Sequence, residues 1–248
     1  MISMKTPLIH ELLGYKNIKI LQNEEMFRFS LDSMILADFI KIKKHTKKII
    51  DLGCGNAPIP LFLTMKTDAK IIGVELQEAV YQLARQSVEI NDFQNQIEII
   101  NDDIKDIYKK LGANTFDIVI SNPPYFKYLP SSNINKNDFL TIARHEVKID
   151  LESIIIEAKR LLIDGGALYM VHRCERISEV INNLKKHNFG LKRMKFIYPK
   201  TTSNQALLFV LEARQNKKDD VVIEQPIYVY LDDGNYTQEV KEIFNFKK

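Results

Sequence analysis

Residues 48–56 read KIIDLGCGN, an apolar run that ends in an acid and passes into two glycines. The run has the form of a buried strand entering a tight turn, because glycine lets the backbone approach a ligand closely. An apolar stretch over 59–65 follows and predicts a helix. A strand, a glycine turn and a helix in this order are typical of an open α/β sheet, which binds its ligand beyond the carboxyl ends of its strands.

Acidic side chains end three successive predicted strands, and Asp51 ends the first of them. A second strand over 69–75 ends at Glu75, about 20 residues beyond the glycines, where nucleotide-binding α/β proteins place the carboxylate that holds a ribose. Asp103 follows a third strand over 96–100. Each acid alone is more often a solvated or capping residue, but three at successive strand ends predict a ligand with several polar parts.

S-adenosylmethionine fits this set of acids, since it has a ribose, an adenine and an amino-acid end. A nicotinamide dinucleotide fits less well, because its fingerprint needs a third glycine and a helix N-terminus facing pyrophosphate, whereas Ala57, Pro58 and Pro60 occupy that turn. We expect Glu75 to hold the ribose hydroxyls, and Asp103 with Ile104 to face the adenine. The residues expected to line the cofactor site are Asp51, Gly53, Gly55, Glu75, Leu76, Asp103, Ile104 and Asn122.

The stretch FDIVISNPPY, residues 116–125, predicts a catalytic loop at the end of a fourth strand, with Asn122, Pro123, Pro124 and Tyr125 as its catalytic residues. The prolines stop the strand, because proline lacks the N–H that continues a ladder, and their fixed φ keeps the loop rigid. The Asn122 side-chain oxygen and the Pro123 carbonyl would accept the two hydrogens of a flat amino group. Tyr125 would stack on the base that bears this amine. The alternative is a simple strand-ending turn, in which these residues are common.

Together, the glycine loop, the acid at Glu75 and the Asn-Pro-Pro-Tyr motif resemble the class I S-adenosylmethionine-dependent methyltransferases, and within them the amino-methylating group marked by this motif. The resemblance implies an α/β fold with a Rossmann-like seven-stranded sheet and helices on both faces. One departure is Ala57, which stands where the family often has a third glycine. This departure affects the expected conformation of the loop more than the expected cofactor.

A closer resemblance covers nearly the whole chain. It is to the bacterial tRNA adenine methyltransferases that modify adenosine 37, in the anticodon loop of a valine tRNA, and it implies that tRNA is the partner. The matching stretches are 13–15, 27–32, 122–126, 143–146 and 171–173. The resemblance implies that substrate-binding residues are Arg28, Phe126, Arg144 and His145.

Other interpretations of these residues stay open. Arg144 would meet a phosphate of the target nucleotide or pair with Glu146 or Asp150, and the stretch around Arg28 would touch ligand or simply anchor the next helix. The same chemistry on a protein glutamine or a ribosomal base is the nearest alternative function. A non-catalytic RNA-binding protein that keeps the fold is a further alternative.

Composition agrees with a single catalytic domain of 248 residues. We expect an N-terminal extension over 1–48 with a helix that caps the cofactor site, a methyltransferase core over 49–215 and a C-terminal tail over 216–248 packed on the core. No apolar run approaches the ~20 residues of a membrane span and the N-terminus lacks a signal-peptide layout, so a cytoplasmic protein is expected. Cys54 and Cys174 provide neither a disulfide framework nor a metal cluster. Nothing in the sequence specifies an oligomeric state.

The net charge is only +3, so the distribution of charge says more about nucleic acid than its sum. Two basic groups would neutralise phosphates or form solvated faces. The first consists of Lys41, Lys43, Lys44, His45, Lys47 and Lys48, and the second of Lys185, Lys186, His187, Lys192, Arg193 and Lys195.

A helix is expected over 31–42, capped by Ser30 or Asp32, with Leu31, Ile35, Phe39 and Ile42 on one face over the cofactor mouth. Later elements are expected as a helix over 151–162, a helix-to-strand turn at 164–166, a strand over 167–171, a helix over 177–187, strands over 191–198 and 206–213, and an extended segment over 221–231.

Overall fold

The computed structural model describes residues 7–23, 30–123, 125 and 150–245. Its centre is a nine-stranded sheet in the order β10-β8-β9-β7-β6-β3-β4-β5, with β11 paired to β8. Seven strands form the expected core: β3 (Lys48–Leu52), β4 (Lys70–Glu75), β5 (Ile97–Asn101), β6 (Phe116–Ser121), β7 (Leu162–Arg173), β8 (Phe189–Lys200) and β9 (Leu208–Gln215). All run parallel except β9. The Rossmann-like prediction is therefore confirmed, and two short strands, β10 (Val222–Ile223) and β11 (Ile227–Tyr230), extend it along β8.

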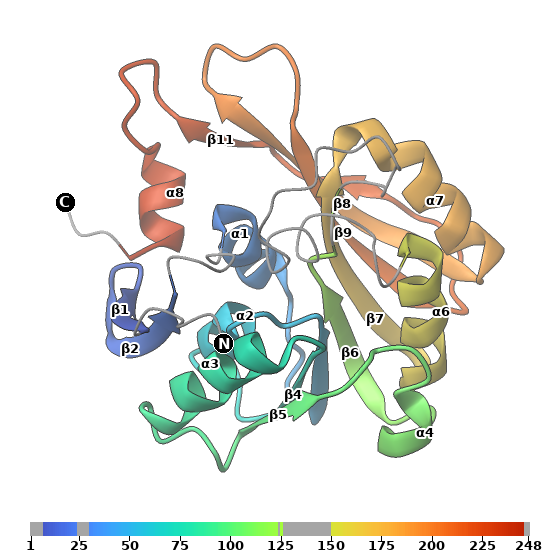
Figure 1. Cartoon of the computed structure of the whole chain (residues 1–248). Coiled ribbons are helices and arrows are strands. Elements are labelled where there is room, and N and C mark those ends of the chain that lie inside the picture. The colour runs from blue at the N-terminus through green and yellow to red at the C-terminus, as the bar shows by residue number, and fades with distance from the viewer. Residues whose placement is uncertain (1–6, 24–29, 124, 126–149, 246–248) are drawn as a thin grey trace, which may run out of the picture.

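Helices cover both faces of this sheet (Figure 1). One face has α1 (Leu31–Phe39), α2 (Pro58–Leu63) and α3 (Glu78–Glu89), and the other has α4 (Tyr108–Leu111), α6 (Leu151–Leu161) and α7 (Ile177–Lys186), which a 3-10 turn (Cys174–Arg176) precedes. In β3, Ile49 belongs to the first apolar core and Ile50 to the second, and both are fully buried. Burial on both faces explains why this strand reads as a continuous apolar run.

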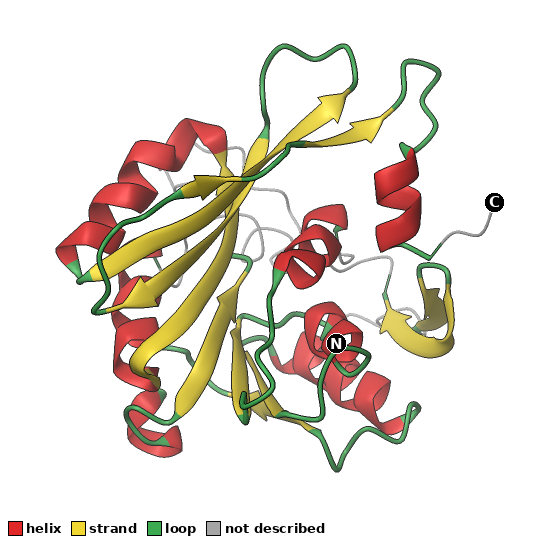
Figure 2. Ribbon diagram, turned by 180° about the vertical axis from the view of Figure 1, so that it is seen from behind, coloured by secondary structure: helices red, strands yellow, loops and turns green. Residues whose placement is uncertain are grey.

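A hairpin and the last helix lie together beside the sheet (Figure 2). The hairpin is β1 (Leu8–Leu12) with β2 (Tyr15–Gln22), and the helix is α8 (Gln238–Ile243). The Gly14 N–H donates to the Phe244 carbonyl at 2.9 Å, and the Tyr15 hydroxyl donates to the Ile243 carbonyl at 3.0 Å. Segments more than 200 residues apart in sequence thus hold each other in place. Among the described residues, no helix is long and apolar enough to cross a membrane.

Two local predictions are wrong. The turn expected at 164–166 lies inside β7, which begins at Leu162 directly after α6. Gly165 adopts φ +72°, and the register between β6 and β7 shifts between Phe116 and Ile118, so the strand bulges and continues instead of starting at Ala167.

The expected cap of α1 is also absent. Ser30 occupies the N-cap position without a capping hydrogen bond from its side chain, and Asp32 lies within the first turn. The helix also ends at Phe39, before Ile42, and it does not present one apolar face, since Ser33, Leu36 and Ala37 are buried along with Ile35 and Phe39. A helix enclosed in this way cannot show a clear amphipathic pattern in its sequence.

Candidate active site

Three of the expected site residues, Asp51, Glu75 and Asn122, lie at one edge of the sheet. The strands β3, β4, β5 and β6 are parallel, so their carboxyl ends share that edge. Asp51 lies near the end of β3, Glu75 ends β4 and Asn122 follows β6 directly. The side chains that were assigned from separate stretches of sequence therefore belong to one neighbourhood.

The loop after β3 depends on backbone conformations that favour glycine. Gly53 and Gly55 adopt φ of +78° and +57°, and a Cβ built on either would meet no atom within 4 Å. Open space beside both glycines is what a ligand resting on the loop requires. Ala57 adopts φ 68° and ψ 36°, the left-handed conformation that costs a non-glycine residue roughly 1–2 kcal/mol. The loop therefore keeps the glycine-like conformation at the position where the sequence departs from the family that it resembles.

Glu75 joins β4 to the glycine loop. Its side chain accepts the Gly55 N–H at 3.0 Å through Oε2 and the Gln77 N–H at 2.9 Å through Oε1. Burial raises the pKa of Glu75, and backbone hydrogen bonds from Gln77, Gly55 and Leu76 oppose that rise. Since each carboxylate oxygen accepts two hydrogen bonds, both oxygens keep a position for a hydroxyl donor, as a ribose would provide.

Asp51 is a buried carboxyl without a partner. It is 1% exposed, and neither of its oxygens has a hydrogen bond to any described residue. Burial and the charge of Glu75 raise the pKa of Asp51 to about 8. A buried carboxyl in this state is costly unless a donor or cation joins it. The amino-acid end of S-adenosylmethionine has a positively charged ammonium that donates hydrogen bonds, so the Asp51 carboxyl fits that cofactor as an acceptor.

Replacing Asp51 with asparagine is expected to stabilise the free protein at pH 8. The folded state holds a proton on Asp51 that the unfolded state releases near pH 4, so the free energy of unfolding falls as pH rises from about 4 to about 8. Asp51→Asn removes that loss, which at about 1.4 kcal/mol per pKa unit amounts to roughly 5 kcal/mol at pH 8. Urea denaturation at pH 5 and pH 8 measures it, with exposed Asp68→Asn as the control. A constant difference between Asp51→Asn and wild type across this range would contradict the assignment.

The expected adenine-facing residues, Asp103 and Ile104, follow β5, whose last residue contacts the backbone of Glu75. The Asn101 side chain donates to the Glu75 carbonyl at 2.9 Å and to the Leu76 carbonyl at 3.1 Å. Leu76 is 36% exposed and Ile104 is buried. Asp103 is exposed, and one of its oxygens accepts the Lys105 N–H. The sequence analysis missed Asn101, whose contact with the carbonyl of Glu75 couples the two strand ends.

The motif predicted to be catalytic contacts α1 through the side chains of Asn122 and Tyr125. Asn122 Nδ2 donates to Ser33 Oγ at 2.9 Å, and the Tyr125 hydroxyl donates to Asn122 Oδ1 at 2.8 Å. The same hydroxyl also contacts the Asp32 carboxylate. Pro123 is buried. The other residues proposed for this part of the site, Pro124, Phe126, Arg28, Arg144 and His145, lie outside the described residues.

His172 packs against Tyr125, with ring centroids 5.7 Å apart and planes tilted by 53°. The imidazole is fully buried, and its Nδ1 accepts the Arg173 N–H at 2.8 Å. Burial and the charge of Arg176 lower the pKa of His172 to about 4. His172 is therefore neutral and packs against Tyr125. The Arg176 side chain donates a hydrogen bond to the Tyr125 carbonyl at 3.2 Å.

Only part of each basic group is placed away from Asn122 by the strand directions. Because β3 and β8 run in the direction of β6, Lys47 and Lys48 at the start of β3 and residues 185–187 before β8 lie at the opposite edge of the sheet. Most cations of the second group are paired with acids of the chain, which favours a structural role for it. The pairs are Lys185–Asp219, Lys186–Glu152, Lys192–Asp220, Arg193–Glu212, Arg193–Glu224 and Lys195–Glu239.

The chain matches the methyltransferase domain family over residues 43–247. A tRNA1(Val) (adenine(37)-N6)-methyltransferase of Haemophilus influenzae is 26% identical over 231 residues, covering 92% of this chain and 94% of that protein. A protein of the same name from Phocaeicola vulgatus is 24% identical over 235 residues, covering 93% of this chain and 96% of that protein.

Solved structures share the fold. A predicted O-methyltransferase from Agrobacterium tumefaciens has a TM-score of 0.67 at 21% identity, covering 86% of this chain and 95% of that chain. A tRNA m1G37 methyltransferase from M. jannaschii has a TM-score of 0.60 at 14% identity, covering 86% of this chain and 58% of that chain.

Proposed function

The chain belongs to the methyltransferase domain family and is an S-adenosylmethionine-dependent methyltransferase, and from this premise we propose that it methylates the exocyclic amine of an adenine in tRNA. The finer form of the proposal is that the target is adenosine 37 in the anticodon loop of a valine tRNA. Relatives with that activity in their names align with more than 90% of this chain, which supports the finer form.

The observation that carries the proposal is the placement of Asn122 at the edge of the sheet that also holds Asp51 and Glu75. An aromatic amine is a poor nucleophile, because its lone pair is delocalised into the ring. A catalyst must therefore hold the nitrogen toward tetrahedral geometry and orient it. Acceptor atoms that bind the two amine hydrogens do this, and they also stabilise the positive charge that develops on the nitrogen.

Asn122 Oδ1 and the Pro123 carbonyl are our proposed acceptors. S-adenosylmethionine, when bound, supplies an electrophilic methyl group on a sulfonium sulfur. The amine becomes strongly acidic only after it is alkylated, so the site needs no general base before transfer. The buried, neutral His172 beside Tyr125 agrees with this, because burial and the charge of Arg176 keep its pKa near 4 and suit it to packing.

The test is to offer the purified protein several acceptors with methyl-labelled S-adenosylmethionine. Unmodified total tRNA, ribosomal RNA and a bacterial protein fraction are incubated separately with equal amounts of enzyme. The proposal expects label in tRNA at a rate well above the other fractions. Label confined to protein or ribosomal RNA would contradict the proposed substrate class but not the proposed active site. Cofactor binding without transfer to any fraction would favour a non-catalytic RNA-binding protein.

A further inference from the structure

The Tyr125 hydroxyl has one hydrogen and lies close to two acceptors. It lies within hydrogen-bond distance of the Asp32 carboxylate and 2.8 Å from Asn122 Oδ1. A phenol carries a single hydrogen, so it satisfies only one of these acceptors fully at a time. Burial, and then the charge of Asp32, raise the pKa of Tyr125 well above its usual range, so the phenol keeps this hydrogen at neutral pH.

The oxygen that Tyr125 contacts is the one that the proposed reaction needs. The other end of the Asn122 amide is held by Ser33, through Nδ2 and Oγ at 2.9 Å. With Nδ2 held, Oδ1 faces Tyr125 instead of rotating away. A target amine that approaches Oδ1 therefore competes with the phenol hydrogen.

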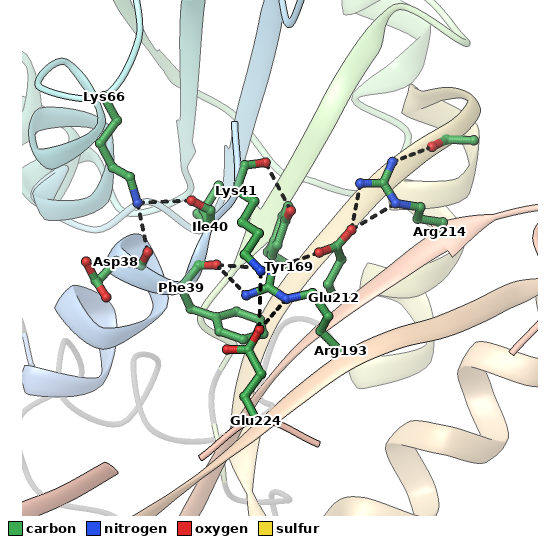
Figure 3. A network of polar contacts seen from close by, with 11 residues as sticks. Asp38, Phe39, Ile40, Lys41, Lys66, Tyr169, Arg193, Glu212, Arg214 and Glu224 are labelled. Carbon is green, nitrogen blue, oxygen red and sulfur yellow. Dashed lines mark hydrogen bonds and ion pairs between the residues drawn. The ribbon is translucent and has the colours of Figure 1, made fainter. Parts of the chain in front are cut away.

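The position of Asp32 is fixed from the far end of its helix. Figure 3 shows the network that holds residues 38–41, at the end of α1. Lys66 Nζ donates to the Asp38 carbonyl at 2.8 Å and to the Ile40 carbonyl at 3.0 Å. The Arg193 guanidinium lies 4.1 Å from the centre of the Phe39 ring.

Acids of the sheet hold Arg193 in turn. Glu224, which follows β10, and Glu212 on β9 accept hydrogen bonds from Arg193 at 2.7 and 2.9 Å (Figure 3). The Tyr169 hydroxyl of β7 donates to the Lys41 carbonyl at 3.2 Å. The α1 helix is thus tied to β7, β8 and β9, so that Asp32 meets the catalytic loop from a rigid support.

We propose that Asp32 is a positioning residue that takes the Tyr125 hydrogen and so leaves Asn122 Oδ1 free for the target amine. A carboxylate is the stronger acceptor, so the phenol turns wholly to Asp32 when the amine arrives. Without Asp32, the phenol stays on Asn122 and competes with the substrate. The inference rests on the proposed function, because it assigns Asn122 Oδ1 to an amine.

The test is a double-mutant cycle of Asp32→Ala and Tyr125→Phe. Asp32→Ala is expected to lower kcat/KM for the RNA at least about tenfold, the effect of one lost charge-assisted hydrogen bond, with the KM for S-adenosylmethionine unchanged. In the Tyr125→Phe background, Asp32→Ala is expected to cause no further loss, because the competing hydroxyl is gone. The double variant should therefore be more active than Asp32→Ala alone.

A matched control and a second readout make the outcome decisive. Asp68→Ala removes an exposed acid that lies outside this network and should leave kcat/KM unchanged. An equal loss from Asp32→Ala in both backgrounds would overturn the proposal, because a purely structural acid does not act through Tyr125.

Titration of Tyr125 in carbon-13-labelled protein tests the contact without any assay of activity. Asp32 raises the pKa of Tyr125, so Tyr125 should ionise at lower pH in Asp32→Ala than in wild type. An unchanged titration would refute the contact, even if wild-type protein failed to methylate tRNA and the proposed function had to be abandoned.

Discussion

Replacing Asn122 with alanine is expected to lower kcat for methyl transfer by about 10²–10³-fold, the usual effect of removing one preorganised group that stabilises developing charge. The side chain contributes Oδ1 to the site while Nδ2 is held by Ser33 at 2.9 Å. Alanine removes both atoms but leaves the backbone and the Pro123 carbonyl in place. The binding of RNA and of cofactor should change little, since neither depends mainly on this amide.

Single-turnover kinetics with saturating S-adenosylmethionine separate this effect from binding. Asn95→Ala serves as the control, because Asn95 is exposed and precedes β5, away from the carboxyl ends of the strands. A variant of Asn122 with an unchanged rate of transfer would refute the assigned mechanism. If RNA affinity fell by the same factor as the rate, Asn122 would act in substrate binding and not in the chemical step.

Replacing Glu75 with alanine is expected to weaken cofactor binding about 100-fold, the combined effect of losing two hydrogen bonds to a charged acceptor. The same change leaves the N–H groups of Gly55 and Gln77 without their acceptor, so the glycine loop should loosen as well. Glu75→Gln keeps one side-chain oxygen and should weaken binding less than alanine does. The two substitutions together separate loss of charge from loss of the loop contact.

Calorimetry with S-adenosylmethionine measures both variants directly. Glu98→Ala is the control, since Glu98 is exposed on the neighbouring strand β5. Unaltered affinity in Glu75→Ala would remove the proposed ribose role. Equal losses in the alanine and glutamine variants would show that the charge of Glu75, and not its contact with Gly55, determines affinity.

The central strands were predictable because most of their residues are buried. The strands β3, β4 and β6 carry apolar side chains toward both cores, so short runs of isoleucine and valine, each ending in a polar residue or glycine, mark them in the sequence. The prediction failed at 164–166, where glycines that usually end a segment instead let β7 bulge. Local residue type does not distinguish a turn from a bulge in a strand whose neighbours are unknown.

The hairpin of β1 and β2 was not predicted, because its stability comes from distant contacts. Most of β1 is exposed, so its sequence lacks the signature of a core strand. Its partner is the end of α8, at Phe244 and Ile243, far away along the chain. Only the folded arrangement brings those backbone groups together.

In the site, too, some features could be predicted from the sequence and others could not. Gly53, Gly55 and Glu75 act within a short stretch whose spacing is a recognisable pattern, so the sequence placed them at one strand edge. The contacts of Asp32 and Ser33 with the catalytic loop span 93 and 89 residues. A periodic pattern in the sequence does not predict contacts between residues so far apart. The sequence predicted a helix over the site, but not which of its side chains contact Asn122 and Tyr125.

Mass spectrometry of the methylated nucleoside tests the central claim most directly. After reaction with labelled S-adenosylmethionine, the tRNA is digested and the label is assigned to an atom and to a position in the sequence. The account predicts N6-methyladenosine at position 37, and Asn122→Ala should abolish most of it. Label on a ribose, on a ring nitrogen or on a base other than adenine would contradict an active site built to hold an adenine amine.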